Sequence, residues 1–180
     1  SLERMNGIEE VDTVGRTMRV KAGTPLQTIQ EAAEQEGLLF PLDLGARGTC
    51  QIGGNVSTNA GGNRVIRYGM TRDNVLGMEA VLSDGTIVTS LNQMIKNNAG
   101  YDLKQLFIGT EGTLGIITRL VLRLREATTE EEVGFVGFET FEQVTGFLKH
   151  MDRSLGGALS AFEVMWHDYF DLVTTAPATN

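Results

Sequence analysis

The sequence predicts an α+β fold in which a mainly antiparallel sheet, flanked by helices, covers roughly residues 17–125. Three observations favour this class. Ser83-Asp84-Gly85 separates two short apolar runs like a hairpin turn, regular βαβ repetition is missing, and the composition changes after Arg125. Beyond that point a glutamate-rich run precedes the apolar pattern of a second, α/β unit. We therefore expect part of one domain over residues 1–126 and the start of another over residues 127–180.

The first strand and the first helix follow from short-range patterns. Alternation of apolar and polar residues over Thr17–Ala22 is typical of a half-buried strand. Thr24 and Gln27 have the spacing of a capping box, and Pro25 suits the first helical position. The helix should end before Gly37, with an apolar stripe formed by Leu26, Ile29 and Ala33.

Three further strands complete the predicted sheet. Residues 78–82 and 86–90 flank the Asp84-Gly85 turn and should pair as a hairpin. The run 115–125 alternates strictly, which predicts a strand with one buried face and one that is solvated or paired with carboxylates. The expected buried face carries Ile116, Thr118, Leu120, Leu122 and Leu124, and the other face carries Ile117, Arg119, Val121, Arg123 and Arg125.

The second unit should open with a β-α-β pattern. Residues 126–132 form a polar linker, and residues 133–138 read as a strand. Thr140 and Gln143 repeat the capping-box spacing at the start of a helix, which Gly156-Gly157 should end before a strand over residues 158–164. The apolar stripe of this helix consists of Val144, Phe147, Leu148 and Met151.

Composition excludes several classes of function. The chain has 41% hydrophobic residues, which predicts a folded, soluble protein, and it lacks the run of about 18 apolar residues that a membrane span needs. Lys and Arg number 15 against 23 Asp and Glu, so nucleic acid is not an expected partner. A single cysteine, Cys50, excludes an internal disulfide. His150 and His167 lack metal-ligand spacing, so we predict neither a metal site nor a catalytic set of side chains.

Two glycine-rich clusters carry the functional signal. The first spans residues 45–62 and the second spans residues 107–117. Glycine lets the main chain approach a ligand closely, whereas so few side chains suit no ordinary core element. Neither cluster has the pattern of a P-loop or of a dinucleotide-binding βαβ unit, although a plain glycine-rich surface loop remains the alternative.

These clusters resemble one family. The matching stretches are Pro41 to Cys50, Ile52 to Gly62, Tyr68-Gly69, Asn98 to Leu103 and Ile108 to Thr118. Together they resemble the FAD-linked 2-hydroxyacid dehydrogenases of the vanillyl-alcohol-oxidase superfamily, and most closely the branch that oxidises D-2-hydroxyglutarate. The resemblance implies the second subdomain of a PCMH-type FAD-binding domain, followed by the start of a substrate-binding cap. It also implies an internal fragment that lacks the first, pyrophosphate-binding subdomain and the catalytic histidines.

The resemblance also implies which residues hold the cofactor. Residues of the first cluster and its approach would wrap the flavin and its phosphates, and those of the second would reach its adenine end. Two roles stay open: Asp43 alternatively caps a turn, and Glu111 alternatively pairs with Arg119 or Arg123. The implied set is Pro41, Asp43, Gly45, Thr49, Gly53, Gly54, Asn55, Thr58, Asn59, Gly61, Gly62, Glu111, Gly112, Gly115 and Ile117.

The implied reaction of the parent enzyme is oxidation of a D-2-hydroxy acid to a 2-oxo acid by non-covalently bound FAD. Its partners would be the small-molecule 2-hydroxy acid and an electron acceptor other than oxygen, in the cytoplasm or the mitochondrial matrix. Two alternatives remain: a D-lactate or glycolate dehydrogenase, and, for this chain alone, an inert flavin-binding or folding module.

Overall fold

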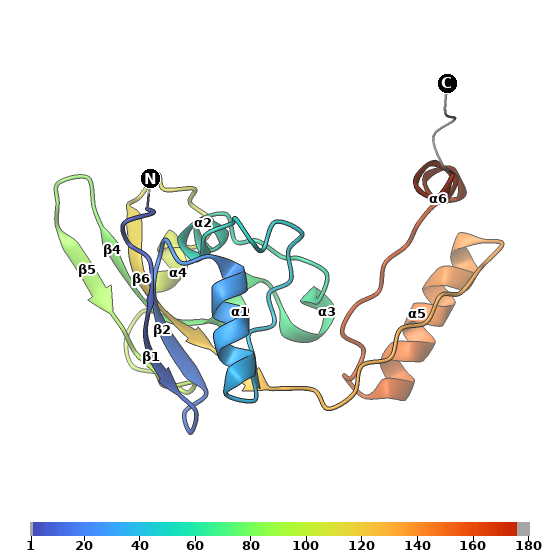
Figure 1. The fold of residues 1–180 in the computed structure, drawn as a ribbon, viewed down its shortest axis with the longest axis horizontal. Coiled ribbons are helices and arrows are strands. Elements are labelled where there is room, and N and C mark those ends of the chain that lie inside the picture. Colours follow the sequence, from blue (N-terminus) through green and yellow to red (C-terminus); the bar gives the residue numbers. More distant parts are fainter. Residues whose placement is uncertain (1, 176–180) are drawn as a thin grey trace.

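A five-stranded antiparallel sheet forms the centre of the larger, N-terminal part of the molecule (Figure 1). The structure is a computed structural model that describes residues 2–175. Every neighbouring pair in the order β1-β2-β6-β4-β5 is antiparallel, as the sequence predicted. The strands are β1 (Ile8–Asp12), β2 (Thr17–Lys21), β4 (Val75–Val81), β5 (Ile87–Ser90) and β6 (Ile116–Arg123).

Short helices lie beside this sheet, and a two-stranded ribbon accompanies the longest of them (Figure 1). One hydrophobic core joins the sheet to helix α1, and Met18, Leu120, Leu26 and Ile29 are fully buried within it. Strand β6, which pairs with both β2 and β4, therefore lies over the centre of the core. The remaining elements of this part are α1 (Leu26–Gln35), β3 (Leu38–Leu39), α2 (Ile52–Ser57), α3 (Val65–Tyr68), the 3-10 helix η1 (Thr71–Asn74), α4 (Lys104–Phe107) and β7 (Arg125–Glu126).

The predicted capping box of the first helix is wrong. Helix α1 begins at Leu26, and Pro25 is its N-cap without a side-chain capping bond. The Thr24 hydroxyl instead donates to the carbonyl of Lys21 at 2.7 Å and accepts the N–H of Gly7 at 3.0 Å. One local and one distant partner thus compete for the hydroxyl, and the bond to Gly7 holds the end of β2 close to the segment before β1.

The predicted hairpin is confirmed. Strands β4 and β5 pair from Met78↔Ser90 to Val81↔Ile87. Within the turn, the Asp84 carboxylate accepts the N–H of Thr86 at 2.9 Å, and Gly85 has a φ of +86°. The turn therefore combines the two features that its sequence indicates, an acceptor side chain and a residue that tolerates positive φ.

Strand β6 does not alternate as strictly as the sequence predicts. Between β4 and β6 the register passes from Glu79↔Arg119 to Ala80↔Ile117, so Thr118 is an extra residue that forms a bulge. The bulge turns Ile117 into the core, whereas Ile116, expected on the buried face, is 51% exposed.

Val121 also departs from the prediction, since it is fully buried on the face that was expected to be solvated. It pairs with Gly77. A Cβ on Gly77 would meet the main-chain N of Asn92 at 2.6 Å, so the chain that follows β5 crosses this face of the sheet.

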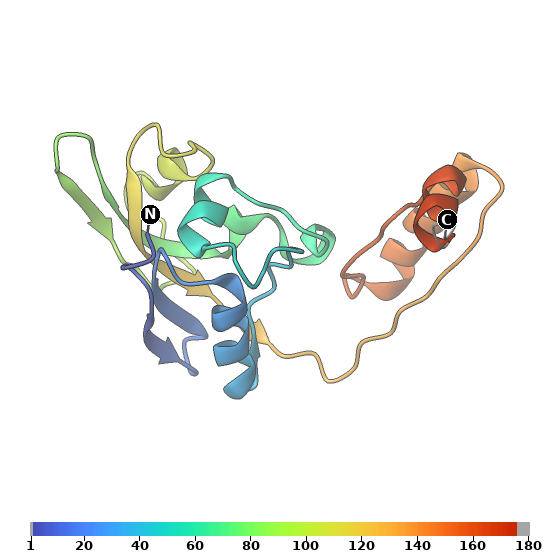
Figure 2. The ribbon, with the colours of Figure 1, turned by 45° about the horizontal axis from the view of Figure 1, so that its top comes forward.

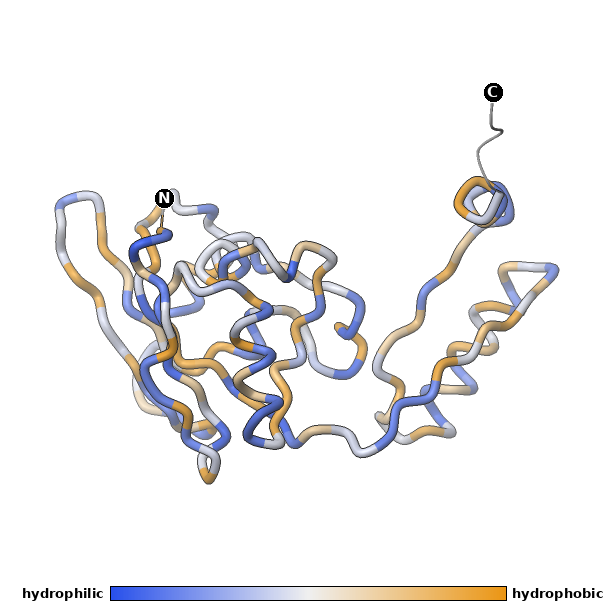
Figure 3. Tube along the Cα trace, viewed as in Figure 1, coloured by the Kyte–Doolittle hydropathy of each residue, from blue (hydrophilic) through white to orange (hydrophobic). Residues whose placement is uncertain are grey.

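The C-terminal part contains two helices, α5 (Phe141–Leu155) and α6 (His167–Thr174), joined to the sheet by an extended segment (Figures 1 and 2). The capping box of Thr140 and Gln143 is confirmed, and Gly156 ends α5 in the left-handed conformation. The predicted strands 133–138 and 158–164 are wrong, since both segments lack a strand partner among the described residues. Neither helix contains a buried residue, and apolar stretches appear in this part as well as in the sheet (Figure 3).

Candidate functional site

The two glycine-rich clusters lie side by side. The N–H of Gly109 donates to the carbonyl of Val56 at 3.2 Å, and the N–H of Glu111 donates to the carbonyl of Ser57 at 2.9 Å. The end of helix α2 therefore holds the second cluster in place. The glycine content identified each cluster in the sequence. The contact between them could not be predicted, because the two clusters are far apart along the chain.

The first cluster contains a helix, contrary to the expectation that it would hold no core element. Ile52 and Val56, four residues apart on α2, are fully buried and anchor the helix to the core. Gly53 is needed for this packing, because a Cβ there would lie 2.7 Å from the Cβ of Ala22. Its N–H also donates to the carbonyl of Ala22 at 2.7 Å, which ties α2 to the end of β2.

Arg72 fastens the second cluster to the rest of the site, and sequence reasoning missed it. Its guanidinium donates to the carbonyls of Ile108 at 2.9 Å and Gln105 at 3.3 Å. Its main-chain N–H donates to the side-chain oxygen of Asn59 at 3.0 Å. No sequence pattern around η1 indicates a role for Arg72, because the tertiary fold alone brings both clusters close to it.

The approach to the first cluster is packed against the rest of the domain. Pro41 is buried, and the amide of Gln30 donates to the carbonyl of Leu42 at 2.7 Å. Gly62 has a φ of +76°, and a Cβ on it would overlap the carbonyl oxygen of Asp43. The Asp43 carboxylate lies 3.9 Å from the Arg64 guanidinium, so this pair takes the place of the turn cap considered for Asp43.

The glycines of the first cluster fall into two groups. Gly53, Gly61 and Gly62 are packed, since a Cβ on each would press against neighbouring atoms. Gly45 and Gly54 are exposed, and a Cβ on either would meet nothing within 4 Å. Packing within the chain therefore does not require glycine at these two positions, where the missing side chain leaves the main chain uncovered.

The polar side chains of the cluster differ in what they already bind. Asn55 is 6% exposed, and its side-chain oxygen is buried without a hydrogen-bond partner among the described residues. Asn59 has a φ of +49° and is engaged by Arg72. Thr58 donates its hydroxyl to the carbonyl of Gly54 at 3.0 Å, and the exposed Thr49 donates to Ala46 at 3.3 Å. The side-chain oxygen of Asn55 is therefore a buried acceptor that could receive a hydrogen bond from a ligand.

In the second cluster, Glu111 is exposed and has a φ of +53°, and Gly112 follows with a φ of +82°. Arg119 pairs with Glu79 at 3.1 Å and with Glu9 at 3.0 Å, and among the described residues Glu111 forms an ion pair with neither Arg119 nor Arg123, the alternative considered for it. Ile117 is 2% exposed and belongs to the core, and it pairs with Ala80 of β4, so it contributes packing rather than an exposed group. A Cβ on Gly115 would lie 2.8 Å from the carbonyl oxygen of Val81, which makes Gly115 a packing residue.

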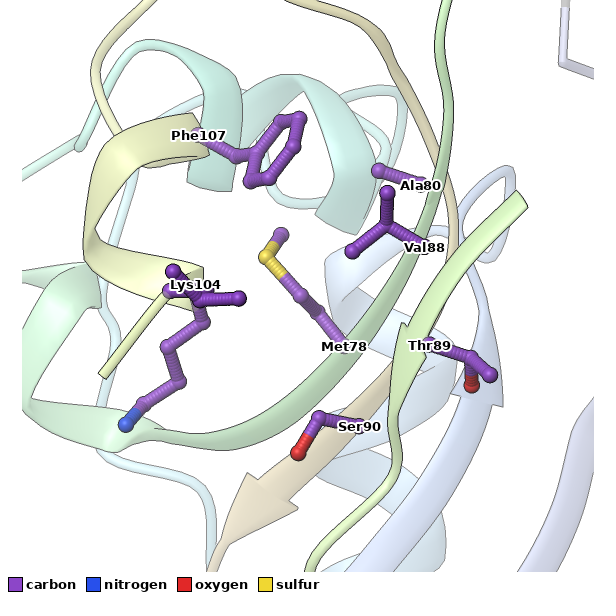
Figure 4. Close-up of a pocket in the computed structure, with 8 residues that line it drawn as sticks. Met78, Ala80, Val88, Thr89, Ser90, Lys104 and Phe107 are labelled. Atoms are coloured by element: carbon purple, nitrogen blue, oxygen red, sulfur yellow. The ribbon is translucent and has the colours of Figure 1, made fainter. Parts of the chain in front are cut away.

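The site is a surface of loops and the short helix α2, separate from two cavities elsewhere in the described residues. A cavity of about 50 Å³ lies between α4 and the β4-β5 hairpin, and Met78 and Phe107 point into it (Figure 4). A second, of about 230 Å³, lies beside residues 92–104. Neither is lined by a predicted site residue. Within residues 2–175 no group of histidine, cysteine and acidic side chains could hold a metal ion, and no helix has the length and apolarity to cross a membrane.

Comparison with known proteins places this arrangement in a family. A family model described as an FAD binding domain matches residues 1–90, half of the chain. The chain belongs to the FAD binding domain family. FAD is therefore its cofactor, as the sequence predicted.

Relatives of the FAD-binding chain carry dehydrogenase names. It is 45% identical to the mitochondrial D-2-hydroxyglutarate dehydrogenase of Bos taurus, covering 94% of this chain and 31% of that protein. It is 45% identical to a D-2-hydroxyglutarate dehydrogenase of Xanthomonas citri, with coverages of 79% and 30%. A protein of Schizosaccharomyces pombe with a D-lactate dehydrogenase name is 42% identical, with coverages of 92% and 31%. The chain thus spans less than a third of the length of these relatives.

A solved structure of alkyldihydroxyacetonephosphate synthase has the same fold. It superposes with a TM-score of 0.68 at 23% identity, over 85% of this chain and 27% of that one. At this identity the likeness concerns the fold alone. It supports the α+β class and the flanked antiparallel sheet that the sequence predicted.

Proposed function

We propose that the protein to which this chain belongs oxidises a D-2-hydroxy acid, of the D-2-hydroxyglutarate type, to a 2-oxo acid. Within it, residues 1–126 contribute part of the FAD site, and residues 127–180 begin the domain that covers the substrate. The names and identities of the bovine and bacterial relatives support the substrate class. The observation that carries the proposal for this chain is the junction of its two glycine clusters through Ser57 and Glu111.

The cofactor-facing surface is formed by main chain rather than by side chains. Gly45 and Gly54 leave the backbone open to a flat, polar group, which fits a flavin nucleotide. The side-chain oxygen of Asn55 accepts hydrogen bonds, so an N–H or O–H group of the cofactor would satisfy it. When bound, FAD supplies the hydride acceptor for the oxidation.

The other residues of the predicted set act around this surface. Thr49 and Thr58 place hydroxyl groups on it, while Pro41, Asp43, Gly53, Gly61 and Gly62 fix the path of the loop. In the second cluster, Glu111 and Gly112 present an exposed turn to the adenine half of the cofactor, and the main chain of Gly115 and Ile117 supports that turn. Asn59 is already bonded to Arg72, so we assign it the role of joining the clusters.

The base that takes the substrate hydroxyl proton and the groups that bind the substrate carboxylate belong to the remaining length of the parent protein. Within the described residues, His150 lies 3.5 Å from Ser154 and His167 lies 3.4 Å from Asp171, both on the exposed C-terminal helices. Neither pair lies near the glycine clusters in the sequence. An electron acceptor is a further proposed partner, and the mitochondrial names of several relatives favour a mitochondrial location.

A second candidate has a specific observation behind it. The relative with a D-lactate dehydrogenase name matches almost as much of the chain as the bovine one does. The chain would be the same flavin-binding module in a D-2-hydroxyglutarate or a D-lactate dehydrogenase. Without the remaining length of the parent protein it would be inactive.

Titration of the purified chain with FAD, followed by flavin absorbance and fluorescence, tests the assignment of the site. Loss of about half of the contacts would turn a nanomolar dissociation constant into one of roughly tens of micromolar. We expect binding in that range, and no bleaching of the flavin by D-2-hydroxyglutarate or D-lactate. Purification with stoichiometric FAD that either acid reduces would show that the chain alone is active. Absence of binding at millimolar FAD would show that the proposed FAD site is wrong. In the parent protein, the two acids added separately decide between the two substrates.

A further inference from the structure

The position of the C-terminal part depends on polar contacts with helix α3. Helices α5 and α6 have no buried residues, and residues 127–143 are exposed throughout. The two parts therefore share no hydrophobic core. Side-chain hydrogen bonds of the described residues join the segment 128–175 to the sheet domain from α3 and its N-cap: Arg64 to Glu131 at 3.4 Å, and Arg67 to the carbonyl of Ala158 at 3.4 Å.

Arg64 has a partner on each side. Its guanidinium lies 3.4 Å from the Glu131 carboxylate in the linker and 3.9 Å from the Asp43 carboxylate in the proposed cofactor loop. Its side chain is 27% exposed, and that of Asp43 is 30% exposed, so both are only partly screened by solvent. One cation is thus shared between the loop and the linker.

The charges around this contact are complementary. The linker carries Glu130, Glu131 and Glu132 in succession, whereas α3 and its N-cap present Arg64 and Arg67. Arg67 also lies with its guanidinium carbon 5.1 Å from the centre of the Tyr68 ring, and Tyr68 is buried, which restricts where the arginine can reach. Helix α3 itself lies on the side of the sheet domain that faces the C-terminal helices (Figures 1 and 2).

We propose that Arg64 and Arg67 form an electrostatic latch that sets the position of the C-terminal part. Exposed ion pairs are individually weak, and opposite charges without hydrophobic packing can separate and re-form. In the closed arrangement the Arg64 guanidinium contacts both Asp43 and Glu131. In the open arrangement it contacts Asp43 alone. The latch does not depend on the identity of the hydroxy acid, so it is tested separately from the proposed reaction.

Distances between two spin labels in the 180-residue chain test the latch. Cys50→Ser removes the native thiol, and Ser83→Cys in the β4-β5 turn and Thr145→Cys on α5 provide exposed labelling sites, one in each part. At low salt we expect one dominant distance. Arg64→Gln should raise the population of longer distances about twofold to fivefold, the range expected for an exposed ion pair, and about 0.5 M salt should do the same to the unaltered chain.

Matched variants separate the latch from a general effect of charge. Arg4→Gln removes the same charge from an exposed arginine near the N-terminus and should leave the distances unchanged. Glu131→Gln should reproduce Arg64→Gln without touching the folded sheet. Identical distance distributions for the unaltered chain, Arg64→Gln and Glu131→Gln at low salt would overturn the proposal, as would an equal effect of Arg4→Gln.

Discussion

The N–H of Glu111 donates a hydrogen bond to the carbonyl oxygen of Ser57, with 2.9 Å between nitrogen and oxygen. The two residues are far apart in the sequence, and each belongs to a different glycine cluster. Ser57 is the last residue of α2, so the bond uses one of the carbonyls that the end of a helix leaves free. It is why two loops that are separate in sequence form one surface.

Two neighbouring glycines should respond oppositely to the same substitution. Gly54→Ala adds a methyl group in open space on a helix, so the free energy of unfolding should rise by up to about 1 kcal/mol. Gly53→Ala pushes a methyl group against Ala22 and should lower it by about 1–3 kcal/mol. Urea unfolding followed by circular dichroism measures both.

The same pair tests the proposed cofactor surface. If FAD lies against the main chain at Gly54, the more stable Gly54→Ala chain should nonetheless bind FAD more weakly. Unchanged FAD affinity in Gly54→Ala would show that the cofactor does not lie against this residue.

Loss of Arg72 should loosen the second cluster. Arg72→Ala leaves the carbonyl of the buried Ile108 without its side-chain donor, which should cost about 1–3 kcal/mol of stability. Amide exchange at Gly109 and Glu111 should accelerate, while exchange in β2 should change only as far as global stability does. The matched change Arg4→Ala, at an exposed position, should stay within about 0.5 kcal/mol. Unaltered exchange at both amides would show that Arg72 does not hold this cluster.

The hairpin turn should weaken in acid. Hydrogen bonds from the main chain and side chain of Thr86 lower the pKa of Asp84 below its ordinary value of 3.8. Because the folded pKa is the lower one, the stabilisation is complete above the unfolded pKa and is lost as the pH falls through the folded pKa. An NMR titration should show the Thr86 amide shifting with a midpoint below 3.8, and Asp84→Asn should abolish that shift. A midpoint at or above this value would mean that the carboxylate is not held as the structure shows.

Any FAD on the chain should be held without a covalent bond. The histidines lie outside both clusters, on α5 and α6, and Cys50 is the only thiol. Precipitation with acid should therefore leave the protein pellet colourless and the flavin in the supernatant. Yellow colour that stays with the pellet, but not with a pellet of Cys50→Ser, would identify Cys50 as an attachment point.

The sequence by itself determined the features that depend on neighbours along the chain. Alternation marked β2, the Asp84-Gly85 pair marked the hairpin, and the spacing of Thr140 and Gln143 marked the start of α5. Glycine content marked both clusters, and the resemblance of their motifs to a known family implied FAD. Each of these signals lies within a few residues, where steric and hydrogen-bonding preferences act without help from the rest of the fold.

Only the tertiary structure decided the features that depend on distant partners. The Thr24 hydroxyl accepts a hydrogen bond from the distant Gly7 instead of capping its own helix, and Thr118 forms a bulge where the register between β4 and β6 shifts. The glycine-rich run around Gly53 and Gly54 becomes helical because Ile52 and Val56 find a core to fill, a gain larger than the helix penalty of glycine. Local preferences are worth about 1 kcal/mol or less per residue, so burial and long-range hydrogen bonds override them wherever the two disagree.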